Sequence, residues 1–290
     1  MKDHIETFEA IGTLWHLQFS SASAILSHKE IMERVRERIR QFDMDYSRFR
    51  NDSLVAQIAR AAGTYRMPED AALMMELYAD LYRQSGGAFT PLIGSTLVDA
   101  GYDAEYSLLP KTLHAPIALE DAYSFNAPYL TAYAPILFDF GAAGKGYLID
   151  IVSHVLKDAG VRSYVIDAGG DILVHMDEPV EIGLENPDDA AEAIGIAALR
   201  SGSICGSSGK RRAWNGYHHI IDPRTLASPE EIRAAWVVAD TAMVADALVT
   251  SLFLVPPSQL SGYDFEYLIM LEDGAVEASP AFPARIFTRS

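Results

Sequence analysis

The sequence predicts an α+β fold in which mixed or antiparallel sheets pack against helices. Stretches with helical spacing and stretches with strand-like alternation follow one another irregularly along the 290 residues, which favours α+β over a doubly wound parallel sheet. An apolar content of 49 % is sufficient for a substantial core. We expect one catalytic unit over 1–290, either a single domain or two interlocked subdomains, because no boundary is evident.

The first half of the chain predicts one strand and two helices. Apolar residues alternate over 13–20, which is typical of a half-buried strand. From Lys29 they recur at helical spacing with charges between them, as in an amphipathic surface helix. A second helix is expected over 68–84, with Leu73, Leu77 and Leu81 on one stripe and two glycines as its stop.

The second half begins with a polar, proline-bearing segment over 102–135, for which we expect loops with short strands. The remaining patterns predict a helix over 144–158, strands over 164–166 and 172–175 around a DAGGD loop, a strand over 236–239, a helix over 241–253 and a final strand over 265–271.

The charge balance excludes several classes of partner. Forty acidic residues against 23 basic ones give a formal net charge of −17, which repels nucleic acid and anionic membrane surfaces. A dinucleotide remains compatible with this charge if backbone N–H groups, a few cations or a metal ion bind its phosphates.

Location and redox chemistry are also constrained. The first ten residues lack the apolar segment of a signal peptide, so we expect a cytoplasmic protein, or a periplasmic or extracytoplasmic one if a leader has been removed. The apolar stretch 241–255 is too short for a membrane span and contains Asp246. The single cysteine, Cys205, excludes an intrachain disulfide and a thiolate cluster, and the sequence shows no base that would activate it.

Four glycine- or aspartate-rich segments indicate close approach of the backbone to a ligand, because glycine lets N–H groups converge on an anion. Each alone is typical of a tight turn, and their co-occurrence carries the signal. They are GGAFTP (86–91), DFGAAGKG (139–146), DAGGD (167–171) and HHIIDPRT (218–225).

In this order, and followed by ADALVT (245–250), these segments resemble the ApbE family of FAD:protein FMN transferases. The resemblance spans most of the chain. It includes Ile11–Gly12–Thr13, which is similar to the family's M-G-T strand, and SRFRNDS (47–53), which matches its S-x-[FY]-x-x-x-S segment. The resemblance implies an ApbE-like, T-fold-like architecture.

The resemblance further implies a magnesium-dependent enzyme that transfers FMN from FAD to a threonine or serine of an acceptor protein, typically a subunit of a membrane electron-transfer complex. It implies catalytic residues His219 and Asp246. It implies an FAD site of Ile11, Phe49, Ala88, Phe89, Thr90, Asp139, Lys145, His219 and Ile220, and a magnesium site of the Ala142 carbonyl, Asp246 and Thr250.

Asp246 and Thr250 also point to a metal without the resemblance. They lie four residues apart on an expected helix, so their side chains share one face. Magnesium takes one or two carboxylates and completes its shell with waters and substrate phosphates. The alternative is that Asp246 is a buried carboxylate that caps a neighbouring loop.

The adjacent histidines, His218 and His219, are a poor zinc pair, because neighbouring side chains of a strand point to opposite faces. We expect His219 to contact flavin or to accept a proton, and Asp171 and Asp246 are the other candidate bases.

One departure from the family pattern follows the DPRT turn. The family usually continues with glycine and then proline, whereas Leu226–Ala227–Ser228–Pro229 follows here, so we expect this turn to be built differently.

Two alternative functions remain open at the level of sequence. A magnesium-dependent FAD pyrophosphatase would use water in place of the acceptor hydroxyl. A flavin-binding or carrier protein would keep the pocket without turnover, although it would have no need of a magnesium site.

Overall fold

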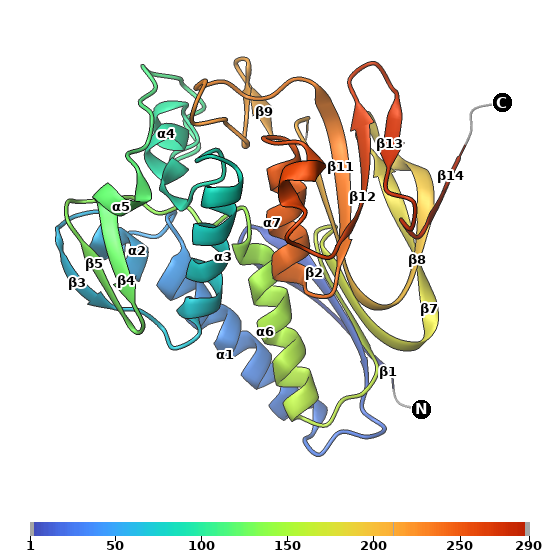
Figure 1. Ribbon diagram of the computed structural model, residues 1–290. Coiled ribbons are helices and arrows are strands. Elements are labelled where there is room, and N and C mark those ends of the chain that lie inside the picture. The colour runs from blue at the N-terminus through green and yellow to red at the C-terminus, as the bar shows by residue number, and fades with distance from the viewer. Residues whose placement is uncertain (1–2, 211, 288–290) are drawn as a thin grey trace.

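The computed structural model describes residues 3–210 and 212–287, and its largest element is a nine-stranded sheet in which every pairing is antiparallel (Figure 1). The α+β fold is therefore confirmed. The strand order is β1 (Asp3–Ala10), β2 (Thr13–Ser20), β6 (Tyr164–Ala168), β7 (Ile172–Asn186), β8 (Asp189–Ser208), β11 (Ile232–Ala239), β12 (Glu266–Leu271) and β13 (Val276–Ala278), with β14 (Ala284–Ile286) paired to β8.

Helices cover one face of this sheet, and a smaller sheet lies beyond them on the left of Figure 1. The helices of this layer are α1 (His28–Tyr46), α3 (Ala71–Gln84), α6 (Gly144–Asp158) and α7 (Ala242–Leu252). The small sheet has the order β3 (Gly63–Arg66), β5 (Tyr129–Ala132) and β4 (Tyr123–Asn126), with the short helices α2 (Leu54–Ile58) and α5 (Leu119–Ala122) beside it.

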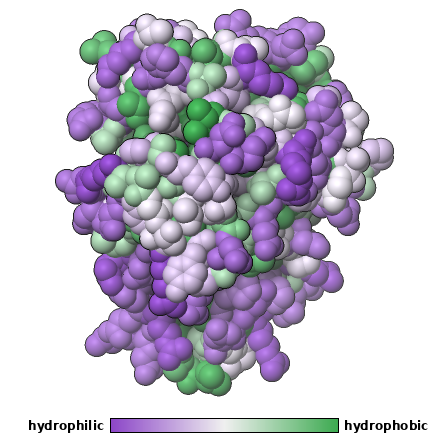
Figure 2. Space-filling model, turned by 60° about the vertical axis from the view of Figure 1, so that its left-hand side comes forward, coloured by the Kyte–Doolittle hydropathy of each residue, from purple (hydrophilic) through white to green (hydrophobic). Residues whose placement is uncertain are grey.

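Short elements complete the connections: the 3-10 helices η1 (Pro91–Ile93) and η2 (Pro257–Leu260), helix α4 (Gly94–Asp99), and the two-residue strands β9 (Ala213–Trp214) and β10 (Tyr217–His218). Hydrophilic side chains dominate the face that Figure 2 brings forward, and apolar ones form small patches there. Within the described chain, every helix is too short or too polar to cross a membrane.

The predicted first strand and helix are confirmed, and their burial explains them. Trp15, Leu17 and Phe19 of β2 are buried against the helix layer, as their alternation predicts. Helix α1 begins at a capping box, in which the Ser27 hydroxyl accepts from the backbone N–H of Glu30 and the Glu30 carboxylate accepts from the N–H of Ser27.

The predicted stripe of α3 is wrong at its first residue. Leu77 and Leu81 are buried, but Leu73 is 59 % exposed. A step of four residues drifts by about 40° around a helix, so two such steps carry Leu73 off the buried face. The helix begins at Ala71, not at Pro68, and ends before Gly86 and Gly87, which adopt φ values of +60° and +87°.

Helices α6 and α7 cross in close contact, and both match the ranges expected from the sequence within one residue at each end. A Cβ atom on Gly146 would lie 2.1 Å from the carbonyl oxygen of Ala242, so only glycine allows this approach. The buried carboxylate of Asp150 accepts from the N–H groups of Ala242 and Met243 at 3.0 and 2.9 Å, which fixes the first turn of α7.

The long β7–β8 hairpin differs from the sequence prediction. The strand expected over 172–175 continues to Asn186, with its register broken between His175 and Val180, and it pairs with the unpredicted β8. The strand expected over 265–271 is confirmed as β12, but it is not the last, since β13 and β14 follow it. A second hydrophobic cluster lies between the hairpin and the neighbouring strands β11, β12 and β14.

Candidate functional site

A cavity of about 500 Å³ lies where the first turns of α6, the middle of α7 and the end of α1 meet the loops that follow α3 and β10. The structure brings every predicted site residue to its lining, although they span most of the sequence. These residues are Ile11, Phe49, Ala88, Phe89, Thr90, Asp139, Ala142, Lys145, His219, Ile220, Asp246 and Thr250.

One end of the cavity is suited to phosphate. Helix α6 begins there at Gly144, and its N-cap residue Ala143 makes no side-chain hydrogen bond to the first turn. The positive pole of the helix therefore lies at the cavity. Lys145 of the same turn forms an ion pair with Asp171, whose side chain is 1 % exposed. Burial alone would lower the pKa of Lys145, but the carboxylates of Asp171 and Asp246 outweigh it and raise that pKa, so the ammonium is charged.

Asp246 lies beside this pair in the middle of α7. Its Oδ2 accepts from the backbone N–H of Gly146 at 2.8 Å, so one oxygen binds the first turn of α6 and not a loop. Its Oδ1 makes no hydrogen bond to the residues of 3–210 and 212–287. Burial raises the pKa of Asp246 well above its ordinary value, and Asp171 adds to this, so the ionised carboxylate needs a cation.

The donor set around Asp246 fits magnesium. Asp246 supplies a carboxylate, Thr250 a hydroxyl one turn further along α7, and Ala142 a backbone carbonyl, and all three line the cavity. Nowhere in the described chain do three or more histidine, cysteine, aspartate or glutamate side chains gather as a metal cluster. Hard oxygen ligands with a single carboxylate are what a magnesium ion shared with a phosphate substrate requires.

Aromatic side chains line the other end of the cavity. The ring of Phe49 is 38 % exposed and stacks on Tyr106 with 5.4 Å between the ring centroids. The Arg48 guanidinium lies over Phe49 and over Tyr102, at 4.2 and 4.9 Å from the two centroids, and pairs with Asp139. This end offers a partly exposed group of aromatic side chains to a planar ring.

Four other predicted flavin residues, Ala88, Phe89, Thr90 and Ile220, line the cavity but are largely buried. Phe89 is 2 % exposed and packs on Tyr78, so its ring belongs to the core. Ala88 and Ile220 are also buried, and the Thr90 hydroxyl accepts from the N–H of Leu92. These positions shape the wall of the cavity.

The two histidines have different surroundings. His218 is held by the Pro229 carbonyl at 2.9 Å and by the N–H of Ile220 at 3.2 Å. His219 lines the cavity, and its Nδ1 has no hydrogen-bond partner among the described residues. Burial, followed by the charge of Arg212, lowers the pKa of His219 to about 3, so its imidazole is neutral at pH 7.

The turn after β10 is closed by backbone and side-chain hydrogen bonds. Leu226 takes the left-handed conformation with φ of +57°, and the N–H of Asp222 donates to the Ala227 carbonyl at 2.9 Å. The Ser228 hydroxyl accepts from the N–H of His218 and so ties the far side of the turn to β10. Arg224 closes the turn with a bidentate pair to Asp222.

Several lining residues were not predicted as site residues. Arg48 stands beside Phe49 in the matched SRFRNDS segment, and its position there is the one signal that the sequence offers. Tyr102 and Tyr106 lie in the weakly periodic segment whose structure the sequence left unresolved. Ser207 and Ser208 end the unpredicted strand β8.

Comparisons with known proteins agree with this arrangement. The sequence model that describes the ApbE family matches residues 11–263 of this chain. An FAD:protein FMN transferase of Treponema pallidum is 27 % identical over 94 % of this chain and 83 % of its own length. One of Rhodobacter capsulatus is 24 % identical over 98 % of this chain, and the chain spans 58 % of that relative's length.

The fold is shared with solved structures of the same family. The ApbE protein of Thermotoga maritima superimposes with a TM-score of 0.83 at 22 % identity, covering 97 % of this chain and 98 % of its own. The flavin transferase ApbE of Vibrio cholerae has a TM-score of 0.81 at 17 % identity, covering 97 % and 98 %.

Proposed function

The chain belongs to the ApbE family, and from this premise we propose that it transfers FMN from FAD to a threonine or serine hydroxyl of an acceptor protein, with release of AMP. The observation that carries the proposal is the composition of the cavity. Its phosphate end gathers a helix N-terminus, Lys145 and the carboxylate of Asp246, and its other end exposes an aromatic ring.

FAD matches the cavity group by group. Its pyrophosphate would lie at the first turn of α6, where Lys145 and backbone N–H groups offset the net charge of −17. One of its ring systems would pack beside Phe49 and Tyr106, whose side chains are partly exposed at the other end of the cavity. Binding of phosphate would compete with Asp171 for Lys145, since both are anions.

Magnesium would be held by Asp246, Thr250 and the Ala142 carbonyl, and when bound it would neutralise charge on the pyrophosphate and on the departing AMP. Asp246 holds its carboxylate in place through the Gly146 N–H and keeps its second oxygen available. The raised pKa of Asp246 accords with this role, because a buried carboxylate without a bound cation favours its protonated form.

The chemical step replaces the phosphoanhydride linkage of FAD by a phosphoester. The acceptor oxygen forms a bond to the FMN phosphorus, and the bond from that phosphorus to the bridging oxygen breaks, so that AMP leaves with the bridging oxygen. The hydroxyl proton passes to a base, for which His219, Asp171 and Asp246 are the candidates. The phosphate charge of bound FAD would raise the low pKa of His219 and make its imidazole a better proton acceptor.

Product analysis tests the proposal. The protein is incubated with FAD, magnesium and a candidate acceptor, for which an electron-transfer subunit of a membrane complex is the first choice, and the intact mass of the acceptor is measured. We expect a gain of one FMN group on the acceptor together with free AMP. Free FMN and AMP with an unmodified acceptor would instead identify a pyrophosphatase, and intact FAD would identify a flavin-binding protein.

A further inference from the structure

The cavity of the candidate site, called the flavin cavity here, is lined by four described side chains of lysine or arginine: Arg48, Arg50, Lys145 and Arg212. Carboxylates of the chain itself neutralise three of them. The ion pairs are Arg48 with Asp139, Arg50 with Asp43 and Asp52, and Lys145 with Asp171. Arg212 forms no ion pair with any carboxylate in 3–210 or 212–287. Its charge is therefore available to a ligand.

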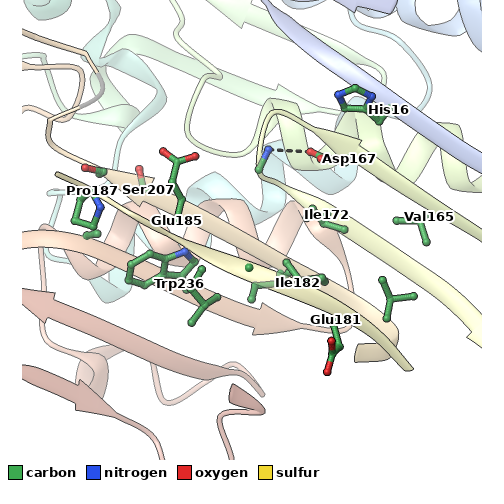
Figure 3. Close-up of a pocket in the computed structure, with 18 of the residues that line it drawn as sticks. His16, Val165, Asp167, Ile172, Glu181, Ile182, Glu185, Pro187, Ser207 and Trp236 are labelled. Atoms are coloured by element: carbon green, nitrogen blue, oxygen red, sulfur yellow. Dashed lines mark hydrogen bonds between the residues drawn. The ribbon is translucent and has the colours of Figure 1, made fainter. Parts of the chain in front are cut away.

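An unpaired cation in this cavity is notable because the chain has 40 acidic residues against 23 basic ones. Figure 3 shows the other cavity, of about 510 Å³, on the outer face of the large sheet. None of the described residues that line it is a lysine or an arginine. Its Asp167 accepts from the backbone N–H of Gly170 at 2.9 Å. Of these two cavities, the flavin cavity is the one suited to an anionic ligand.

The Arg212 guanidinium is held at the aromatic end of the flavin cavity. Its Nη1 donates to the hydroxyl oxygen of Tyr102 at 3.3 Å. The ring of Tyr102 is buried and stacks on Trp214, with 5.5 Å between the centroids, and the Trp214 indole donates to the Ala100 carbonyl at 2.7 Å. This buried support fixes the Tyr102 hydroxyl. The other N–H groups of the guanidinium have no partner among the described residues.

The charge of Arg212 acts on two neighbouring side chains. Burial raises the pKa of Tyr102 to about 12, although Arg212 acts against this rise, so the hydroxyl is protonated at pH 7 and does not neutralise the guanidinium. Burial also lowers the pKa of His219, and the charges of Arg212 and, further down in size, of Lys145 add to this effect. Two cations therefore lie near one imidazole, although Lys145 belongs to the first turn of α6 and Arg212 to the segment between β8 and β9.

We propose that Arg212 is a second phosphate-binding residue of the flavin cavity, which contacts the pyrophosphate of FAD from the aromatic end while Lys145 contacts it at the first turn of α6. This inference rests on the proposed function, because it takes FAD as the ligand. The planar fork of a guanidinium matches two phosphate oxygens. Arg212 also gives up no carboxylate when it binds, whereas Lys145 must leave Asp171. A cation at the pyrophosphate stabilises the charge that collects on the oxygen leaving with AMP.

Two variants and one control isolate this contact. Arg212→Gln removes the charge and keeps a polar side chain, and Arg212→Lys keeps the charge but loses the fork. The matched control is Lys210→Gln, which removes the same charge from the same segment at a position outside the lining of the cavity. Lys210 is exposed and pairs with Asp188, so its loss should change neither the fold nor the binding of FAD.

Flavin fluorescence titrations of the full chain measure the dissociation constants of FAD and of riboflavin, which has no phosphate, at constant magnesium and at low and high salt. At low salt we expect Arg212→Gln to weaken FAD binding about tenfold or more and Arg212→Lys about threefold, with Lys210→Gln within about twofold of the wild type. The loss in Arg212→Gln should shrink at high salt. The affinity for riboflavin and the melting temperature should not change.

The role of Arg212 is excluded if Arg212→Gln binds FAD as tightly as the wild type at low salt, or if Lys210→Gln weakens FAD binding equally. A parallel loss of riboflavin affinity would assign Arg212 to the ring and not to the phosphates. If riboflavin binds too weakly to be measured, the salt dependence decides, because the FAD affinity of Arg212→Gln must fall less steeply with salt than that of the wild type. A wild-type protein that binds no FAD would overturn the proposed function together with this inference.

Discussion

Lys145 pairs with Asp171 and lies near Asp246, which places one cation and two carboxylates at the phosphate end of the cavity. Only one carboxylate is neutralised by Lys145, and the other is stabilised by a single backbone N–H. This surplus of negative charge is costly in a buried site unless a cation joins it. The individual roles of these side chains can be separated by substitution.

Asp246→Asn is expected to lower FMN transfer by ~100-fold or more, because a neutral amide holds a hard dication poorly and the metal contributes several kcal/mol. The fold should survive, since the amide oxygen can still accept from the Gly146 N–H. Intact-mass kinetics and the melting temperature measure both effects. Thr250→Val should lower the rate of FMN transfer less than Asp246→Asn does, because water can replace a neutral hydroxyl. A folded Asp246→Asn protein that modifies its acceptor at the wild-type rate would exclude the magnesium site.

Lys145→Ala is expected to weaken FAD binding about tenfold at low salt, because it removes one charge-assisted contact to phosphate. The matched control is Lys157→Ala, at the exposed end of the same helix. Calorimetry at low and high salt should show the difference shrink as salt screens the contact. Lys145→Ala should also lower the melting temperature, because it leaves Asp171 without its cation. Equal FAD affinities of the two variants at low salt would assign Lys145 no phosphate contact.

His219 makes the stability of the fold depend on pH. Its folded pKa of about 3 lies below the ordinary value of 6.5, so below pH 6.5 the unfolded chain binds a proton that the folded one does not. Stability should therefore fall as the pH is lowered from 6.5 towards 3, by about 1.4 kcal/mol per pH unit from this residue. Urea unfolding of the wild type and of His219→Gln at pH 7 and pH 5 measures it, with a smaller loss expected in the variant. Equal losses would show that His219 is not buried in its neutral form.

At the scale of elements, the crossing of α6 and α7 determines where the ligand groups lie. Lys145 and Gly146 come from the first turn of α6, and Asp246 and Thr250 come from the middle of α7. Because Gly146 also donates to Asp246, the helix contact and the orientation of the carboxylate depend on the same residue.

Gly146→Ala is expected to destabilise the protein by about 1–3 kcal/mol or more through overpacking, because its Cβ would lie 2.1 Å from the Ala242 carbonyl oxygen and 2.8 Å from the Asp246 Cβ. Gly144→Ala is the control in the same turn, where the nearest atoms outside the helix are 3.6 Å away. It should be neutral or slightly stabilising, since alanine favours a helix. Thermal unfolding compares the two, and a Gly146→Ala protein as stable as Gly144→Ala would contradict the close crossing.

Elements with a strong period could be predicted from the sequence, and elements with a weak one could not. Helix α6 and strand β2 place apolar residues at regular intervals, and their ranges agree with the structure. Strand β8 consists largely of alanine, glycine and serine, and β1 is mostly polar, so neither gives the alternation of a buried strand. Both acquire their conformation from the strands that pair with them.

The candidate site shows the same division. Residues in glycine-rich segments, such as Lys145, could be identified because the segments match a family pattern. The structure then places residues of these segments in the lining of one cavity. Tyr102 and Tyr106 could not, because they belong to an irregular segment with no period, and tertiary contacts alone bring them beside Phe49. No property of the local sequence shows that Ser207 and Ser208, at the end of β8, line the cavity.

At the scale of the whole molecule, the net charge of −17 opposes every anionic ligand. The phosphate end of the cavity counteracts it locally through Lys145 and a helix N-terminus, and the other end offers aromatic rings for stacking. A ligand that contacts both ends gains binding free energy from both, whereas a ligand that fills a single end gains it from that end alone.

FAD is therefore expected to bind more tightly than FMN, because a whole dinucleotide can contact both the phosphate end and the aromatic end of the cavity. We expect a difference of about tenfold or more in the dissociation constants in the presence of magnesium. Calorimetric titration of the same preparation with each flavin measures it. Equal constants would show that the adenylate half makes no net contribution and would count against FAD as the substrate.

Cys205 lies near the end of β8, and its buried Sγ is 3.7 Å from the Ala242 carbonyl oxygen. The buried carboxylate of Asp171 lies near this thiol. Burial raises the pKa of this thiol well above its ordinary value, so the reactive thiolate is scarcely formed in the folded protein. Peroxide and disulfide reagents consequently reach it only when the sheet separates from α7. The folded enzyme has no sulfenic acid chemistry of its own at this cysteine, and oxidative damage to it would be a consequence of unfolding and not a cause.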